Sequence, residues 1–277
     1  MNLKIFFLLL SLVYSSNKDI RNEFQQIVNE LNSKDYNPTK PEESFLVSAL
    51  YFLGTPYVSG TLEVNQEEKL VVNFKELDCT TLVETCMALS RTLNKKEFDF
   101  TSYCNELQSI RYRKGIINGY TSRLHYISEW ISDNEEKGIL TDITQKTGGI
   151  KYLIKLSFMS DHAALYNRLK EHPERIDSIK KIEQQINDAG NRYYLPKAQI
   201  KSKESFIKDG DIICFTTSIE GLDVSHMGIA YRKDGILTFI HASSNEKKVI
   251  INPASIHEYC KRMKKNTGIM ILRVNGN

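Results

Sequence analysis

The sequence predicts an α+β fold, in which helices come first and antiparallel strands come last. Apolar residues in 79–93 recur three or four positions apart, which is the spacing of a helix with one buried face. The last third instead contains short apolar runs separated by turn residues, a pattern typical of strands. We expect these strands at 211–215, 226–231, 236–242 and 268–274. A chain of 277 residues buries a core without disulfide or metal support.

The segments before residue 79 alternate between regular structure and turns. Residues 19–32 and 42–53 have helical patterns, and 54–60 is rich in glycine, proline and other turn residues. Residues 69–74 form a short apolar run that is typical of a strand. The stretch at about 95–195 is mainly helical, and without repeats or a low-complexity linker we interpret it as a helical insertion in a single domain.

The first 15 residues are typical of a signal peptide. Lys4 precedes a short apolar run, and Val13 and Ser15 occupy the −3 and −1 positions of a cleavage site. The run is too short to span a bilayer as a helix. We therefore expect a mature domain at 16–277 that is exported, periplasmic or secreted, with no stable membrane insertion after cleavage.

The charge pattern argues against a nucleic-acid partner. The formal charge is only +3, and 26% of the residues are charged, with both signs interleaved along the chain. A nucleic-acid-binding face needs a basic stripe, and the sequence shows none. This pattern favours an ordinary solvated surface.

Five cysteines are present, at positions 79, 86, 104, 214 and 260. An odd number in an exported protein leaves at least one thiol unpaired within the monomer. Cys79 is the candidate for reactivity because Asp78 is a good N-cap, which places Cys79 in the first turn of the 79–93 helix. The unpaired N–H groups and the dipole at a helix start favour a thiolate. An inert buried cysteine is the alternative.

Two histidines in the C-terminal strands provide a partner for this thiol. Asp234-Gly235 is a hairpin signal, and a two-residue loop there pairs Lys233 with Ile236. In that register His226 and His241 project from the same face as diagonal neighbours. One imidazole then takes the thiol proton and the other orients it, an arrangement that needs no metal or other cofactor. Zinc bound by the thiol and both histidines is the alternative.

Taken together, these residues resemble the N-acetylmuramoyl-L-alanine amidase-like family of the NlpC-type papain-like cysteine peptidase superfamily. The stretches that carry the resemblance are 54–57, 77–84, 122–126, 210–213, 221–229 and 241–244. The resemblance implies a papain-like α+β fold, with helices packed on a small antiparallel sheet. It also implies that Cys79 is the nucleophile, His226 the base and His241 its orienting partner.

Five further residues are candidates for substrate binding. The resemblance maps substrate-lining positions onto Tyr57 and Asp78. Arg123, His125 and Tyr126 form a polar-aromatic cluster suited to a carboxylate or a sugar, because arginine binds carboxylates through two parallel hydrogen bonds. Packing of these three side chains against the core is the alternative reading.

The resemblance implies a hydrolase whose substrate is peptidoglycan or a muropeptide. The expected bond joins the muramyl lactyl group to L-alanine. Cleavage between D-glutamate and the third stem residue is the second possibility. A thiol acyltransferase and a non-catalytic wall-binding or effector protein of the same fold are further alternatives. The intact Cys79, His226 and His241 set favours an enzyme.

Overall fold

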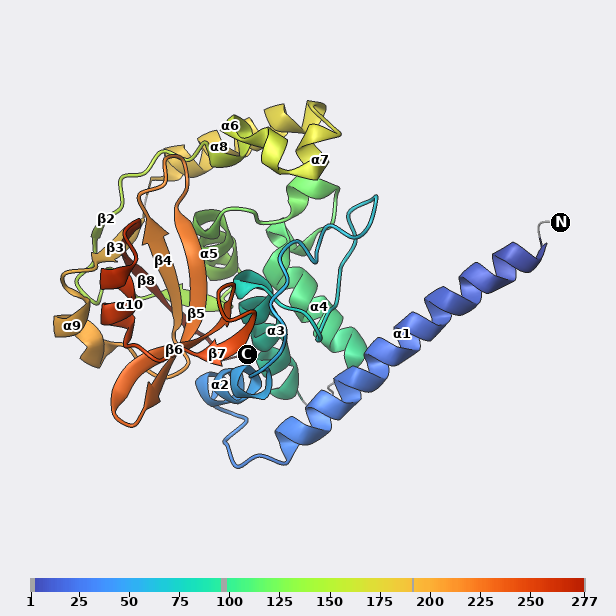
Figure 1. Cartoon of the computed structure of the whole chain (residues 1–277), viewed down its shortest axis with the longest axis horizontal. Helices are drawn as coiled ribbons and strands as arrows, with labels where there is room; N and C mark the ends of the chain where they lie inside the picture. The colour runs from blue at the N-terminus through green and yellow to red at the C-terminus, as the bar shows by residue number, and fades with distance from the viewer. Residues whose placement is uncertain (1–2, 96–98, 191, 277) are drawn as a thin grey trace.

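The computed structural model describes residues 3–95, 99–190 and 192–276 and shows one antiparallel sheet with helices on both faces (Figure 1). The helices are α1 Leu3–Asn32, α2 Pro41–Tyr51, α3 Cys79–Leu93, α4 Phe100–Arg111, α5 Ile127–Glu136, α6 Phe158–Asp161, α7 Asn167–Lys170, α8 Glu174–Ala189, α9 Ile200–Lys203 and α10 Ile256–Arg262. The strands are β1 Leu140–Asp142, β2 Ile150–Lys151, β3 Tyr193–Pro196, β4 Ile212–Thr217, β5 Val224–Lys233, β6 Ile236–Ser243, β7 Lys248–Ile251 and β8 Asn266–Val274.

The sheet has eight strands, in the order β2-β3-β8-β4-β5-β6-β7, with β1 also paired to β8. All of its ladders are antiparallel. The α+β class and the four strands expected in the last third are therefore confirmed. The sheet is larger than the small one expected, because β1, β2 and β3 come from the stretch predicted to be helical and β7 was not predicted.

The hairpin formed by β5 and β6 has the predicted register. Lys233 pairs with Ile236, and the two loop residues Asp234 and Gly235 both have positive φ, at 51° and 79°. Two left-handed residues in a two-residue loop match the right-handed twist of the flanking strands. The Asp-Gly pair thus sets which face of the sheet each residue of β5 and β6 occupies.

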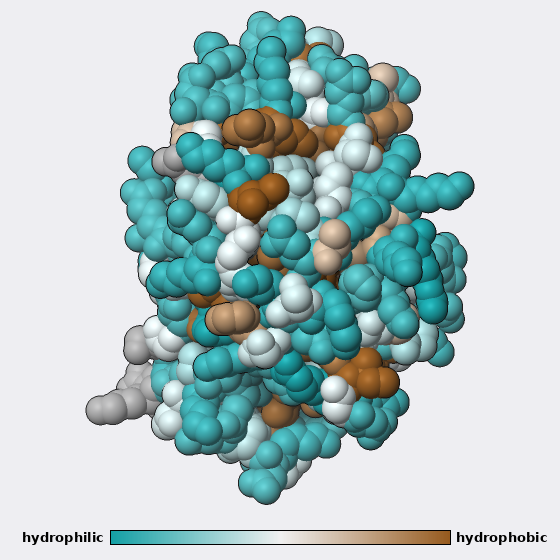
Figure 2. All heavy atoms as spheres, turned by 90° about the vertical axis from the view of Figure 1, so that its left-hand side faces the viewer, coloured by the Kyte–Doolittle hydropathy of each residue, from teal (hydrophilic) through white to brown (hydrophobic). Residues whose placement is uncertain are grey.

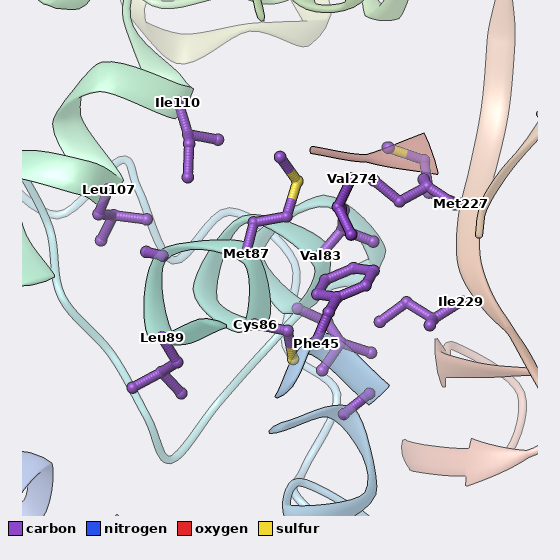
Figure 3. Packing of buried hydrophobic residues seen from close by; sticks show 14 of the residues in the cluster. Phe45, Val83, Cys86, Met87, Leu89, Leu107, Ile110, Met227, Ile229 and Val274 are labelled. Carbon is purple, nitrogen blue, oxygen red and sulfur yellow. The ribbon is translucent and has the colours of Figure 1, made fainter. Parts of the chain in front are cut away.

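Two hydrophobic clusters cover the two faces of the sheet. The larger lies between the sheet and α2, α3, α4 and α5, and Met227 and Ile229 of β5 contribute to it from the sheet. Figure 3 shows these two side chains directed towards α3, where Val83, Cys86 and Met87 lie. The second cluster lies between the opposite face and α9 and α10. Alternation along β5 therefore sends Met227 to the α3 face and His226 to the α10 face.

The stretch at 95–195 is less independent than a helical insertion would be. Tyr103 and Leu107 of α4 and Trp130 of α5 belong to the main core. A separate small cluster involves α6, α7 and α8, with Met159, Leu169 and Ile179 at its centre. These three helices lie at the top of the sheet in Figure 1. The loop before α6 rests on the β4–β5 loop, since the backbone N–H groups of Ser157 and Phe158 donate to the Gly221 carbonyl.

Residues 69–74 do not form the expected strand. Their carbonyl groups bond to side chains instead of to a neighbouring strand. Arg111 Nη1 donates to the Val71 carbonyl at 2.7 Å, and the Tyr112 hydroxyl donates to the Lys69 carbonyl at 3.1 Å. A short apolar run therefore does not identify a strand when side chains satisfy the hydrogen bonds of its backbone.

The predicted helix at 19–32 is the C-terminal part of α1, which begins at Leu3 and extends away from the body of the protein (Figure 1). Phe24, Ile27, Val28 and Leu31 anchor it in the main core. The predicted cleavage point after Ser15 lies within this helix. In the part of the chain that the structure describes, no helix is long and apolar enough to cross a bilayer. The face seen in Figure 2 is mostly hydrophilic, with its apolar residues in small separate groups.

Candidate active site

Cys79 is the first residue of α3, as the sequence predicted. The Asp78 carboxylate accepts the Thr81 backbone N–H at 2.8 Å, and the Thr81 hydroxyl accepts the Asp78 backbone N–H at 2.8 Å. This reciprocal capping box satisfies two donors at the helix start and fixes the direction in which α3 begins. The cap holds the partly buried Cys79 side chain at the edge of the helix that faces β5.

The loop at 54–58 brings Tyr57 to the same place. On one side it pairs with β7, because the Gly54 N–H donates to the Val249 carbonyl at 2.9 Å. On the other side Tyr57 forms a parallel bridge with Leu77, two residues before Cys79. The pKa of the Tyr57 hydroxyl is raised, first by burial and then by the charges of Cys79 and Asp78. The structure therefore groups Tyr57, Asp78 and Cys79.

The Cys79 thiol meets β5 through backbone as well as side chains. Its sulfur lies 4.0 Å from the Thr80 hydroxyl, and the backbone N–H of Met227, the residue that follows His226, lies close enough to lower the pKa of the thiol. The pairing of β5 with β6 runs only as far as Ile229 and Ile240. Met227 thus lies beyond the last pair of that ladder. Among the described residues no hydrogen bond joins the thiol to His226 directly.

The two predicted histidines meet side by side. His226 Nε2 and His241 Nδ1 are 2.7 Å apart, a hydrogen-bonding distance. The rings are nearly perpendicular, with an interplanar angle of 84°. Since Nε2 of His226 is used by His241, its Nδ1 is the nitrogen left for a proton from another group. In the described parts of the chain, no group of three or more His, Cys, Asp or Glu side chains is arranged to hold a metal ion.

Aromatic rings surround the histidine pair. Phe215 stacks on His226 with centroids 5.7 Å apart, and Phe239 lies 4.6 Å from His241. Tyr259 of α10 contacts both, at 6.3 and 6.1 Å. Burial, and then the second histidine, lowers the pKa of His226 to about 3, and burial lowers the pKa of His241 to about 4. Both imidazoles are therefore neutral at pH 7, as a general base must be.

The thiol also differs from the expectation. Burial first and the Asp78 charge second raise the pKa of Cys79 to about 11, because the Met227 N–H and Thr80 offset them only in part. The helix start thus does not make a thiolate at neutral pH in this structure, because desolvation outweighs the N–H donors. All five cysteines are free thiols. At neutral pH the Cys79 thiol and the His226 imidazole are therefore both uncharged.

A cavity of about 570 Å³ opens beside the histidines, on the α10 face. His226, His241 and Tyr259 line it, together with the ends of β4, β5 and β6 and the turn between α10 and β8. Cys79 is not among the residues that line it. The volume falls within the range of small-molecule sites.

Arg123, His125 and Tyr126 have partners of their own in the structure. Arg123 forms ion pairs with Glu63 at 2.9 Å and with Glu68 at 3.1 Å. His125 Nε2 lies 2.9 Å from the Tyr120 carbonyl, and the Tyr126 hydroxyl donates to Glu183 at 2.7 Å. Within the described residues, none of these contacts involves Cys79, His226 or His241.

Sequence reasoning missed two features of the site. They are the Met227 N–H beside the sulfur and the Tyr259 ring against both histidines. The predicted register did put Gly228 opposite His241, and a Cβ on Gly228 would lie 2.6 Å from Phe239 Cδ2 and 3.4 Å from His241 Cβ. A glycine inside a strand pattern marks such a close approach of a neighbour.

The model of one protein family, described as N-acetylmuramoyl-L-alanine amidase-like, matches residues 47–269. The chain belongs to this amidase-like family. The match includes Tyr57, Cys79, His226 and His241 and thus the whole constellation described above. No curated protein sequence matches the chain closely enough to count as a relative.

Solved structures agree with membership of the amidase-like family. An N-acetylmuramoyl-L-alanine amidase from Bacteroides uniformis is 42% identical, with a TM-score of 0.80 over 84% of this chain and 99% of that one. A Bacteroides fragilis protein named as a xylanase is 43% identical, with a TM-score of 0.79 over 82% and 99%. A Legionella pneumophila protein, 22% identical with a TM-score of 0.70 over 96% of both chains, shares the fold.

Proposed function

We propose that this protein is an N-acetylmuramoyl-L-alanine amidase that hydrolyses peptidoglycan or its fragments through a Cys79–His226–His241 mechanism on a papain-like, NlpC-type scaffold. One observation carries the proposal. His226 is hydrogen-bonded to His241, and the backbone N–H of the next residue, Met227, lies close enough to the Cys79 sulfur to lower its pKa. This arrangement supports the roles that we propose, with Cys79 as the nucleophile, His226 as the base and His241 as the group that orients the base.

The neutral resting pair sets the order of the chemistry. His226 removes the thiol proton as sulfur attacks the carbonyl carbon, so the thiolate is never a stable species. The Cys79 backbone N–H, in the first turn of α3, is the donor we assign to the oxyanion. The carbon–nitrogen bond then breaks, and His226 passes its proton to the leaving amine. Water, activated by the same ring, releases the acyl group from sulfur.

His241 holds the imidazolium that forms in each half-reaction. Its Nδ1 is 2.7 Å from His226 Nε2, so a positive charge on His226 is shared with an aligned acceptor. Tyr57 and Asp78, which lie beside the thiol, are the residues we propose for the substrate side of Cys79. The contacts of Arg123, His125 and Tyr126 give a substrate role for them no comparable support.

One similar structure is named as a xylanase, but the described residues of this site do not include the pair of carboxyl groups that a xylanase reaction uses. Glycoside hydrolysis requires two carboxyl groups about 5–10 Å apart on either side of the bond. Of the described residues that line the cavity, Glu246 alone carries a carboxylate. The signal-peptide pattern at 1–15 supports export to the compartment where peptidoglycan lies.

The test is digestion of purified peptidoglycan by wild type, Cys79→Ala and the matched control Cys104→Ala, with products identified by mass spectrometry. We expect wild type and the control to release stem peptides that begin with L-alanine, and Cys79→Ala to release none. Cleavage after D-glutamate would support the endopeptidase instead. Equal turnover by Cys79→Ala, or none by wild type, would contradict the mechanism.

A further inference from the structure

The bond between the two histidines can carry its proton in two ways. A neutral imidazole has one N–H and one nitrogen with a free lone pair, so either ring can be the donor. In the first arrangement His226 Nε2 donates to His241 Nδ1, and His226 Nδ1 keeps the lone pair that a base needs. In the second, His241 Nδ1 donates, and His226 carries its own proton on Nδ1. Only the first arrangement allows the proposed reaction.

We propose that Asn252 is a positioning residue that holds both histidines in the first arrangement by accepting the N–H of His241 Nε2. A neutral ring with its proton on Nε2 has a free lone pair on Nδ1, so His241 can then only accept from His226. The inference rests on the proposed amidase function, because it explains why the base is available. It adds a residue that acts through another side chain and not on the thiol.

The register of the strands places Asn252 beside His241. His241 pairs with Ile250 of β7. Asn252 continues that ladder, since its backbone N–H donates to the Phe239 carbonyl at 2.8 Å. Residues two apart on a strand share a face, so Asn252 and His241 are diagonal neighbours on the α10 face. The same relationship joins His226 to His241, and the three side chains form a diagonal row that lines the cavity.

The orientation of the Asn252 amide is fixed by Ala254. Nδ2 of Asn252 donates to the Ala254 carbonyl at 2.7 Å. A carbonyl can only accept, so Oδ1 is the amide atom left to accept from His241. The backbone is held as well, because the Thr238 hydroxyl lies 2.6 Å from the Asn252 carbonyl and 2.9 Å from the Ala254 carbonyl. The acceptor is therefore in place independently of the ring.

His241 Nε2 is buried and needs such a partner. His241 is 4% exposed and Asn252 is 8% exposed. Burial lowers the pKa of His241 to about 4, and a hydrogen bond with the Asn252 side chain partly offsets that shift. A partner that favours the charged ring accepts from it, as Oδ1 does. Among the described residues no atom meets strict hydrogen-bond geometry at Nε2. We give more weight to the proximity of Asn252, because buried ring nitrogens are rarely left unpaired.

The positions of the two protons can be read from wild type by NMR. Long-range proton–nitrogen correlation spectra of protein with isotope-labelled histidine distinguish a protonated ring nitrogen from a bare one. The signals of His226 and His241 are those that His226→Ala and His241→Ala each remove from the six histidines of the chain. We expect a proton on Nε2 and none on Nδ1 in both rings at pH 7. A proton on His226 Nδ1 would overturn the proposal.

Asn252→Leu removes the acceptor with little change in volume. We expect the second arrangement to appear in its spectra, with a proton on His226 Nδ1. We also expect kcat to fall by roughly 10- to 100-fold, the equivalent of one buried hydrogen bond, with little change in KM. The matched control is Asn134→Leu, because Asn134 is a buried amide of α5 whose side chain donates to two backbone carbonyls. It should lose stability but keep the wild-type spectra and kcat. Unchanged spectra or an unchanged kcat in Asn252→Leu would contradict the proposal.

Asn252→Asp distinguishes this role from packing alone, and it also serves if Asn252→Leu does not fold. A carboxylate still accepts from His241 Nε2, and its negative charge raises the pKa of an adjacent imidazole. We expect the acid limb of kcat/KM to move up by roughly one to three pH units. The other titratable groups near the pair are unchanged in this variant, and they are His226, Glu246, Tyr259, Lys264 and Lys265 at the cavity and Cys79 on α3. A limb that stays at its wild-type position would contradict the proposal, because packing alone does not move it.

The spectra and the turnover fail separately. The spectra report the proton positions whether or not the protein hydrolyses peptidoglycan. The expected proton positions together with no hydrolysis by wild type would remove the amidase function and keep the assignment of Asn252 as the acceptor. Hydrolysis by wild type together with an unchanged kcat in Asn252→Leu would remove only this inference.

Discussion

His226 and His241 are joined by a hydrogen bond of 2.7 Å between Nε2 and Nδ1, across two strands that no longer pair at that point. The bond leaves His226 with one free ring nitrogen and ties its orientation to β6. The adjacent Met227 N–H lies close enough to the Cys79 sulfur to lower its pKa, so the hairpin brings the proposed base near the proposed nucleophile. This relationship underlies the predictions that follow.

Replacing the second histidine should slow the chemical step. In His241→Ala the His226 ring loses its orienting partner and the group that stabilises its charge. We expect kcat to fall by roughly 10²- to 10⁴-fold with a smaller change in KM. Steady-state kinetics on a soluble muropeptide measures both. The matched control is His172→Ala, because His172 is half-exposed and pairs with Glu174 instead of with the two histidines of the hairpin. The control should behave as wild type. An unchanged kcat in His241→Ala would exclude the orienting role.

The enzyme should keep its kcat/KM down to an unusually low pH. The base must be neutral, and the pKa of His226 is lowered from 6.5 to about 3 and that of His241 to about 4. The acid limb of kcat/KM should therefore lie near pH 4, and it belongs to the pair because the two titrations are coupled. A midpoint near 6.5 would show that the imidazole is not desolvated in the working enzyme.

Loss of activity through acid unfolding must be distinguished from the acid limb of the kcat/KM profile. Between pH 6.5 and about 3 the unfolded chain binds protons on these histidines that the folded chain does not, so stability falls as the pH falls through this window. Circular dichroism over the same pH range identifies the loss of folded protein. The limb counts as catalytic only where the fold persists.

Asp78 should control both the helix start and the thiol. Asp78→Asn keeps an oxygen for the Thr81 N–H but removes the charge that raises the pKa of Cys79. We expect the iodoacetamide reaction of Cys79 to shift to lower pH in Asp78→Asn with little loss of stability. Asp78→Ala should shift it likewise and also lose about 1 kcal/mol of unfolding free energy. Superimposable labelling profiles for wild type and Asp78→Asn would show that the charge has no such effect.

Gly228 should not tolerate a side chain. The added Cβ of Gly228→Ala would lie 2.6 Å from Phe239 and 2.9 Å from the Ile240 carbonyl, so β6 must move, and His241 with it. We expect a loss of about 1–3 kcal/mol of unfolding free energy and reduced turnover. Urea unfolding and kinetics measure the two effects. Gly276→Ala, where the Cβ meets its nearest atom only at 4.0 Å, is the control; equal stability of the two variants would contradict the packing argument.

The sequence was sufficient for features set by local chemistry. The Asp78 cap predicts where α3 begins, and Asp234-Gly235 predicts the hairpin register and hence the shared face of His226 and His241. Features that depend on distant parts of the chain were not predictable. The ion pair of Arg123 with Glu63 joins residues 60 positions apart, and the high thiol pKa depends on how closely β5 covers α3.

Trapping the acyl-enzyme tests the central claim most directly. Wild type is mixed briefly with a defined muropeptide, quenched in acid, digested with protease and analysed by mass spectrometry. The mechanism predicts a thioester on the peptide that contains Cys79, with the mass of the muramyl lactyl group. Two results together would contradict the mechanism. Wild type and Cys104→Ala would turn over the muropeptide without any adduct on Cys79, and Cys79→Ala would hydrolyse it at an undiminished rate.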